Sequence, residues 1–113
     1  IDRVHTLCHF DFHPLNIIYH EGKYYPIDWT NAKLASPVMD IASTYIIFRQ
    51  YLKRQANKYL KMMSKKTNYH IKDVIEAIPV MAFIRLRENN QEEHEELLNE
   101  MILCKDKIYS LFK

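Results

Sequence analysis

The chain has 113 residues, of which 48% are hydrophobic, and its formal net charge is +2. One glycine and four prolines exclude a disordered or low-complexity chain, and the length suits one domain with its own core. The sequence lacks the run of about 20 apolar residues that crosses a bilayer, and its basic excess is small for a nucleic-acid-binding module. We therefore expect a domain that binds neither membrane nor nucleic acid.

The cysteines and the first residues indicate compartment and context. Cys8 and Cys104 show no framework spacing, so we expect reduced thiols in a cytoplasmic protein. Residues 1–5 lack the basic start and the apolar stretch of a signal peptide. The chain begins with Ile1 and reaches its most reactive segment almost at once, so we expect a piece of a longer protein.

The first part of the chain is rich in residues that favour strands. Residues 4–8 predict a short strand that ends in a loop at 9–16. Residues 16–20 and 23–27 predict two further strands, and Glu21-Gly22 between them is a compact hairpin signal. We therefore expect a small β-unit that gathers its loops at one edge.

The rest of the chain predicts helices. Pro37 suits the first turn of a helix, and its apolar pattern continues into a basic segment until residues 66–70 break it. Another helix is predicted over 71–87, with Pro79 as a kink or junction inside it. The last is predicted over 91–112, with glutamates in its first turns and lysines at its end. The fold class is therefore α+β and mostly helical, a single domain in which a β-hairpin unit precedes about three helices.

The most informative segment is the run His9-Phe10-Asp11-Phe12-His13-Pro14-Leu15-Asn16, followed after the hairpin by Ile27-Asp28-Trp29. It supplies two carboxylates and an amide from neighbouring loops. Phosphoryl transfer from a nucleotide needs one carboxylate that orients the attacking hydroxyl and accepts its proton. It also needs oxygen ligands that hold Mg²⁺ on the phosphates. The segment therefore predicts a phosphotransfer site.

Each of these residues has a simpler interpretation when it is taken alone. Asp11 is then a loop or capping residue, Asp28 a turn residue at a strand end, and Asn16 the start of a strand. Asp40 is then a carboxylate favoured by the helix dipole. The simple interpretations are favoured one by one, whereas the resemblance described next favours the functional one for all four residues in this order.

Three motifs in the chain resemble those of the aminoglycoside phosphotransferase and choline kinase group. They are His9-x-Asp11-x-His13-Pro14-x-Asn16, Ile27-Asp28-Trp29 and Pro37-x-x-Asp40-Ile41-Ala42. The helical tail is similar to the closing segment of bacterial members, in Ile78-Pro79-Val80-Met81-Ala82 and Arg85-Leu86-x-Glu88-Asn89. The resemblance covers nearly the whole chain and implies the carboxy-terminal lobe of the protein-kinase-like fold.

The resemblance also implies residue roles. Asp11 matches the catalytic aspartate, while Asn16 and Asp28 match the two Mg²⁺ ligands. His9 and Asp40 match positions that support the catalytic loop, Asp40 by holding backbone N–H groups. The implied reaction transfers the terminal phosphate of ATP or GTP to a hydroxyl of an aminoglycoside, a choline-like alcohol or a sugar.

Other residues are expected on the acceptor side of the site. His13 and Trp29 lie within the motifs and are candidates for contacts with the substrate. The break at 64–70 and the glutamates of 92–96 are further candidates, and a cationic acceptor would favour the glutamates by charge. A solvated acidic helix start is the simpler interpretation of those glutamates. Phe10, where relatives often have glycine, either packs inward or crowds the acceptor.

A kinase-like enzyme also needs an amino-terminal lobe that holds the nucleotide phosphates through a lysine. Only ten residues precede Asp11, so we expect that lobe to be a missing partner and the isolated chain to be inactive. Two alternatives stay open at this point. One is a truncated pseudo-phosphotransferase or interaction module without catalysis. The other is a Zn²⁺-dependent hydrolase that uses His9, Asp11 and His13, whose alternation would place them on one side of a strand.

Overall fold

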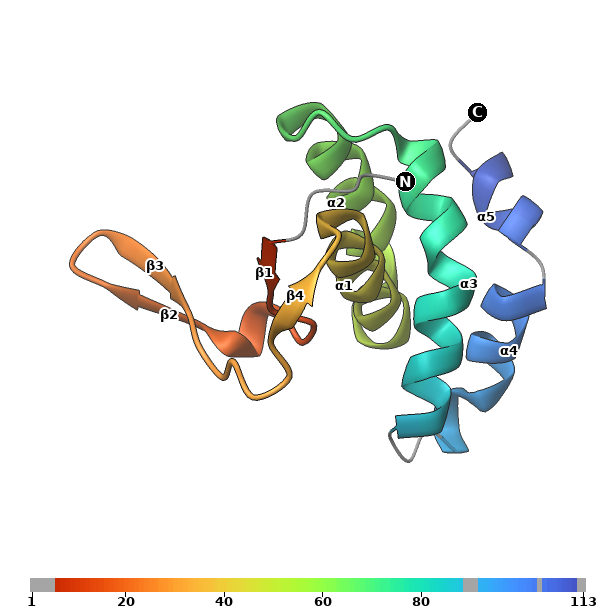
Figure 1. Cartoon of the computed structure of the whole chain (residues 1–113), viewed down its shortest axis with the longest axis horizontal. Helices are drawn as coiled ribbons and strands as arrows, with labels where there is room; N and C mark the ends of the chain where they lie inside the picture. Colours follow the sequence, from red (N-terminus) through yellow and green to blue (C-terminus); the bar gives the residue numbers. More distant parts are fainter. Residues whose placement is uncertain (1–5, 89–91, 104, 112–113) are drawn as a thin grey trace.

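The computed structural model describes residues 6–88, 92–103 and 105–111, with the strands first and the helices after them (Figure 1). The strands are β1 (Thr6–Cys8), β2 (Ile17–His20), β3 (Lys23–Pro26) and β4 (Lys33–Ala35). The helices are α1 (Pro37–Tyr51), α2 (Lys53–Lys66), α3 (Ile71–Glu88), α4 (Glu95–Leu103) and α5 (Lys105–Ser110). Short 3-10 turns lie at Pro14–Asn16 and Glu92–His94. The fold is therefore α+β and mostly helical, as the sequence predicted.

The predicted hairpin is formed by β2 and β3, which project away from the helices in Figure 1. The strands pair antiparallel, with Ile17 opposite Pro26 and His20 opposite Lys23. Glu21 and Gly22 both have positive φ, 48° and 79°, which a two-residue turn between right-twisted strands requires. The sequence signal and the backbone geometry agree at this turn.

A second antiparallel pair joins β1 to β4, with Thr6 opposite Ala35 and Cys8 opposite Lys33. The sequence pattern predicted a strand at 4–8, of which residues 4 and 5 lie outside the described residues, and it did not indicate β4. This pairing brings the end of β1 close to the start of α1, because β4 leads into that helix. The loop after Cys8 is therefore placed against α1.

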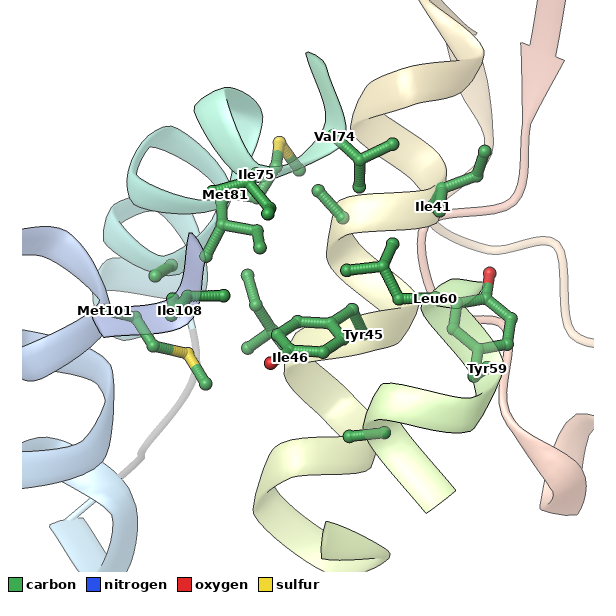
Figure 2. Close-up of a cluster of buried hydrophobic side chains, with 14 of the residues drawn as sticks. Ile41, Tyr45, Ile46, Tyr59, Leu60, Val74, Ile75, Met81, Met101 and Ile108 are labelled. Atoms are coloured by element: carbon green, nitrogen blue, oxygen red, sulfur yellow. The ribbon is translucent and has the colours of Figure 1, made fainter. Parts of the chain in front are cut away.

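The hydrophobic core lies between the helices, and α1 occupies its centre (Figure 2). Helix α1 packs against α2 and α3, and α4 and α5 pack against the other side of α3. The largest fully buried side chains of the core include Tyr45, Ile46, Leu60, Ile75, Ile78, Leu98 and Met101. Among the described helices, none is both long and apolar enough to cross a membrane.

The helix boundaries differ from the sequence prediction in two places. The described residues hold five α-helices rather than about three. The apolar pattern continues past Leu52, yet α1 ends there because the Leu52 backbone turns to φ −135° and ψ 52°. This turn lets α2 fold back and bury Leu60 in the core. The helix predicted over 91–112 is divided into α4 and α5, and residues 91, 104 and 112 lie outside the described residues.

Because Leu60 is fully buried in the core, we expect Leu60→Ala to lower the free energy of unfolding by about 2–5 kcal/mol. Urea denaturation followed by circular dichroism measures this loss. Met62→Ala is the matched control, because Met62 is exposed on the same helix. Equal losses for the two variants would contradict the placement of the α2 face.

Candidate active site

Asp40 connects the first turn of α1 to the loop that follows β1. Its Oδ2 accepts a hydrogen bond from the backbone N–H of His9 at 3.0 Å, and its Oδ1 accepts one from Phe10 at 2.9 Å. A carboxylate is favoured at this end of a helix by the helix dipole. Both oxygens of Asp40 therefore hold the backbone just before Asp11.

Phe10 adopts a backbone conformation that glycine tolerates better. Its φ is 64°, which costs an L-residue about 1–2 kcal/mol. The hydrogen bond to Asp40 and the packing of the ring offset this cost, because the ring contacts the hydrophobic core. Phe10 therefore packs inward, which is one of the two outcomes considered from the sequence.

His9 joins the loop of Asp11 to the segment that ends β3. Its side chain is 3% exposed, its Nδ1 accepts from the Asp11 N–H at 3.1 Å, and its Nε2 donates to the Ile27 carbonyl at 2.6 Å. These partners place the ring proton on Nε2. The His9 ring also packs on the Trp29 ring, with centroids 4.6 Å apart, so Trp29 supports the position of His9. Trp29 itself remains 44% exposed.

Asp11, His13 and Asn16 form a hydrogen-bonded cluster. The Asn16 Nδ2 donates to the Asp11 backbone carbonyl at 2.8 Å and to its Oδ2 at 3.1 Å, and it lies 3.2 Å from His13 Nε2. His13 Nε2 is also 3.5 Å from Asp11 Oδ1. Because the described contacts of the Asn16 amide use Nδ2, its Oδ1 is available to a cation. The Asp11 carboxylate is held between a donor amide and an imidazole.

Asp28 follows the segment that His9 and Asn16 hold. The Ile27 N–H donates to the Asn16 carbonyl at 2.8 Å, so the two loops are joined directly before Asp28. Asp28 is exposed, and its φ of 58° is also in the left-handed region. Strained backbone of this kind concentrates at functional sites.

The Asp28 carboxylate has a depressed pKa. The Thr30 Oγ1 and N–H both donate to its Oδ1, and these hydrogen bonds lower the pKa most. Desolvation, the next largest effect, raises the pKa, and smaller electrostatic interactions with His9 and His13 lower it. Asp28 is therefore ionised at neutral pH.

The oxygen donors of the site fit Mg²⁺. The Asn16 amide oxygen and the Asp28 carboxylate are hard ligands of the kind that Mg²⁺ prefers, and Asn16 is held 8% exposed by its bonds to Asp11. Within the described ranges, no three His, Cys, Asp or Glu side chains are grouped to hold a metal ion. A Zn²⁺ set of His9, Asp11 and His13 is wrong, because both ring nitrogens of His9 already have protein partners.

A cavity of about 500 Å³ opens beside the Asp11 cluster. Its walls are residues 13–15, the end of α1 at Ile47, Tyr51 and Leu52, and Arg85 of α3. Neither Tyr51 nor Leu52 stood out in the sequence, and Arg85 did so only through the resemblance of the tail. No local pattern marks them, since they meet only when α1 and α3 pack.

A family model described as the phosphotransferase enzyme family matches residues 2–70. The match covers more than half of the chain and includes all three motifs, and the chain belongs to this family of kinase-type enzymes. Phosphotransfer to small molecules is the general activity of the family. No curated protein and no solved structure matches the chain. The tail motifs, including Arg85, lie beyond the matched residues.

The contacts of Asp40 predict that Asp40→Asn lowers the free energy of unfolding by about 2 kcal/mol. The native carboxylate accepts two backbone hydrogen bonds, whereas an asparagine has only one acceptor oxygen. Its NH₂ group would face the other backbone N–H, so one charge-assisted hydrogen bond is lost. Urea denaturation gives the stability, and amide hydrogen exchange at His9 and Phe10 locates the change. Asp73→Asn, in the first turn of α3, is the control and should have little effect. Unchanged exchange at both amides would contradict the assignment.

The depressed pKa of Asp28 gives a prediction for pH. A carboxyl whose pKa is lowered by folding stabilises the protein above its ordinary pKa, and this contribution is lost as pH falls through the folded pKa. Thr30→Val removes the strongest donor, so the pKa of Asp28 should rise toward its ordinary value. Titration of the carboxyl carbon by NMR measures it. A carboxyl pKa that does not move would mean that Thr30 is not the cause.

Proposed function

We propose that this chain is the catalytic, carboxy-terminal lobe of a protein-kinase-like phosphotransferase that uses ATP or GTP and Mg²⁺. The acceptor is a hydroxyl of a small molecule. The observation that supports this most is the Asp11 carboxylate, held by Asn16 and His13 beside a cavity of about 500 Å³. Family membership supports the type of reaction.

In this proposal Asp11 is the catalytic residue. Its carboxylate accepts a hydrogen bond from the acceptor hydroxyl and takes the proton as the oxygen forms its bond to phosphorus, while the bond to the nucleoside diphosphate breaks. Asn16 and Asp28 would hold Mg²⁺, which neutralises charge on the phosphates. His9 and Asp40 are positioning residues, because they act on the backbone of the two loops.

The proposal includes an amino-terminal lobe that binds the nucleotide. Several large apolar side chains of the strands are exposed, and a second lobe would cover them: Leu7, Ile18, Tyr19, Tyr24, Tyr25 and Leu34. These side chains lie on both sheets, and the hairpin projects away from the helical core. In this proposal the 113-residue chain alone has little or no activity.

We also assign the protein to the cytoplasm. The proposed donor, ATP or GTP, is a cytoplasmic metabolite. Cys8 is a buried free thiol, and burial raises its pKa, so it behaves as a small apolar residue and not as a nucleophile.

The test compares Asp11→Asn with the native residue in the intact protein that carries this chain. With MgATP and a hydroxyl acceptor, kcat should fall by about 10²–10⁴-fold, since the general base is lost. The KM for ATP should change little, because Asp11 is not assigned to the metal. Asp73→Asn is the control, as an exposed aspartate of α3. Coupled measurement of ADP formation provides both constants.

Three outcomes would contradict the proposal or a part of it. Equal kcat values for the native protein and Asp11→Asn would remove Asp11 from catalysis. Absence of turnover in the intact protein across cationic, neutral and anionic alcohols would favour the alternative, an inactive interaction module. Turnover by the isolated 113-residue chain would remove the need for a second lobe.

A further inference from the structure

The cavity beside Asp11 has a definite chemical character. A volume of about 500 Å³ suits a small molecule. Much of its wall is hydrocarbon, from Pro14, Leu15, Ile47 and Leu52, and Tyr51 adds an aromatic ring. Leu15 is 86% exposed, although it is a large apolar side chain beside a reactive loop. A ligand with an apolar body would cover these surfaces.

Arg85 supplies the fixed charge of this cavity. Its Nε–H donates to the Gln50 side chain, and it forms a hydrogen bond with the Tyr51 side chain, so both of these partners are neutral. Burial lowers the pKa of Arg85, because its surroundings disfavour the cation, and interactions with the Tyr51 side chain and with the Asp11 carboxylate oppose this effect. The hydrogen-bond partners of this half-buried guanidinium are neutral, and Asp11, the carboxylate that acts on it, is not part of the cavity wall. An anion that enters the cavity would therefore stabilise it further.

Among the residues that the structure describes, no aspartate or glutamate lines the cavity. The glutamates considered from the sequence as partners of a cationic acceptor do not form its wall: Glu93, Glu95 and Glu96 are all exposed. His94 of the same segment contacts the ring of the wall residue Tyr51, with centroids 5.0 Å apart, but His94 itself does not line the cavity. A cationic acceptor would therefore meet a like charge at Arg85.

We propose that the acceptor is a hydroxyl-bearing small molecule with an apolar, aromatic-sized body and one anionic group, which Arg85 binds. This inference rests on the proposed phosphotransfer at Asp11. The anion pairs with the guanidinium on the α3 side of the cavity, and the body contacts Leu15 and Leu52. The hydroxyl lies at the His13 wall, where His13 Nε2 is 3.5 Å from Asp11 Oδ1. Arg85 is thus a specificity-determining residue, and cationic aminoglycosides and choline are poor acceptors.

The test measures equilibrium binding to the intact protein by calorimetry, without nucleotide. Three phenols of similar size differ in charge: 4-hydroxyphenylacetate is an anion, 4-ethylphenol is neutral and tyramine is a cation. We expect affinity to fall in that order, with about tenfold or more between the anion and the cation. Arg85→Met should remove most of this preference, and Arg85→Lys should retain part of it, since the charge remains without the planar fork.

Arg87→Met is the matched control, because Arg87 is an exposed arginine of the same helix that lies over the Phe83 ring. It should leave the preference unchanged. The inference is overturned if tyramine or 2-deoxystreptamine binds more tightly than 4-hydroxyphenylacetate. It is also overturned if the Arg85 variants weaken binding of ATP while the order of the phenols stays the same, since Arg85 would then serve the nucleotide.

These results are separable from the test of phosphotransfer. Binding of the phenols requires no turnover, so the charge preference can be present even if Asp11→Asn leaves kcat unchanged. Conversely, loss of turnover in Asp11→Asn with no preference among the phenols would support the reaction and reject the assignment of Arg85. Circular dichroism shows whether each variant is folded. If Arg85→Met is unfolded, Arg85→Lys tests the inference in its place.

Discussion

The two hydrogen bonds that Asp40 accepts from the backbone hold the site together. A positive φ is costly for a phenylalanine such as Phe10. In this conformation the N–H groups of His9 and Phe10 both donate to the Asp40 carboxylate, which offsets the cost. Asp40 can provide that carboxylate because β4 pairs with β1 and leads into α1. A small sheet contact therefore determines where the Asp11 side chain lies.

From Asp40 the hydrogen bonds continue through both loops. The His9 backbone is bonded to Asp40, and the His9 ring is bonded to the Asp11 N–H and to the Ile27 carbonyl. The Ile27 N–H donates to the Asn16 carbonyl, and the Asn16 side chain donates to Asp11, which closes the circuit. Each bond contributes only about 1 kcal/mol net. A closed circuit is more rigid than its separate bonds, because no single loop can move without breaking several of them. The candidate metal ligands and the candidate base are thus held in one frame.

The site and the cavity depend on different parts of the chain. The hydrogen-bonded frame belongs to the segment that matches the family, whereas Arg85 and the far wall of the cavity come from the helices packed behind it. The family match indicates phosphotransfer to small molecules in general, and in our proposal the cavity selects the acceptor. In our proposal charge is the deciding property, since the Arg85 guanidinium at that wall would pair with an anion and repel a polycation.

The sequence alone determined what is local. The candidate residues Asp11, Asn16 and Asp28 lie within short motifs, and the hairpin turn needs only Glu21 and Gly22 with positive φ, so neighbouring residues carry the information. Tertiary structure decided what depends on distant contacts: the β1–β4 pair, the break at Leu52, the inward packing of Phe10 and the cavity at Arg85. It also removed the zinc interpretation, because only the folded chain shows that both nitrogens of His9 are used. The periodicity of apolar residues indicates which face of a helix is buried, but only tertiary packing determines which element covers that face.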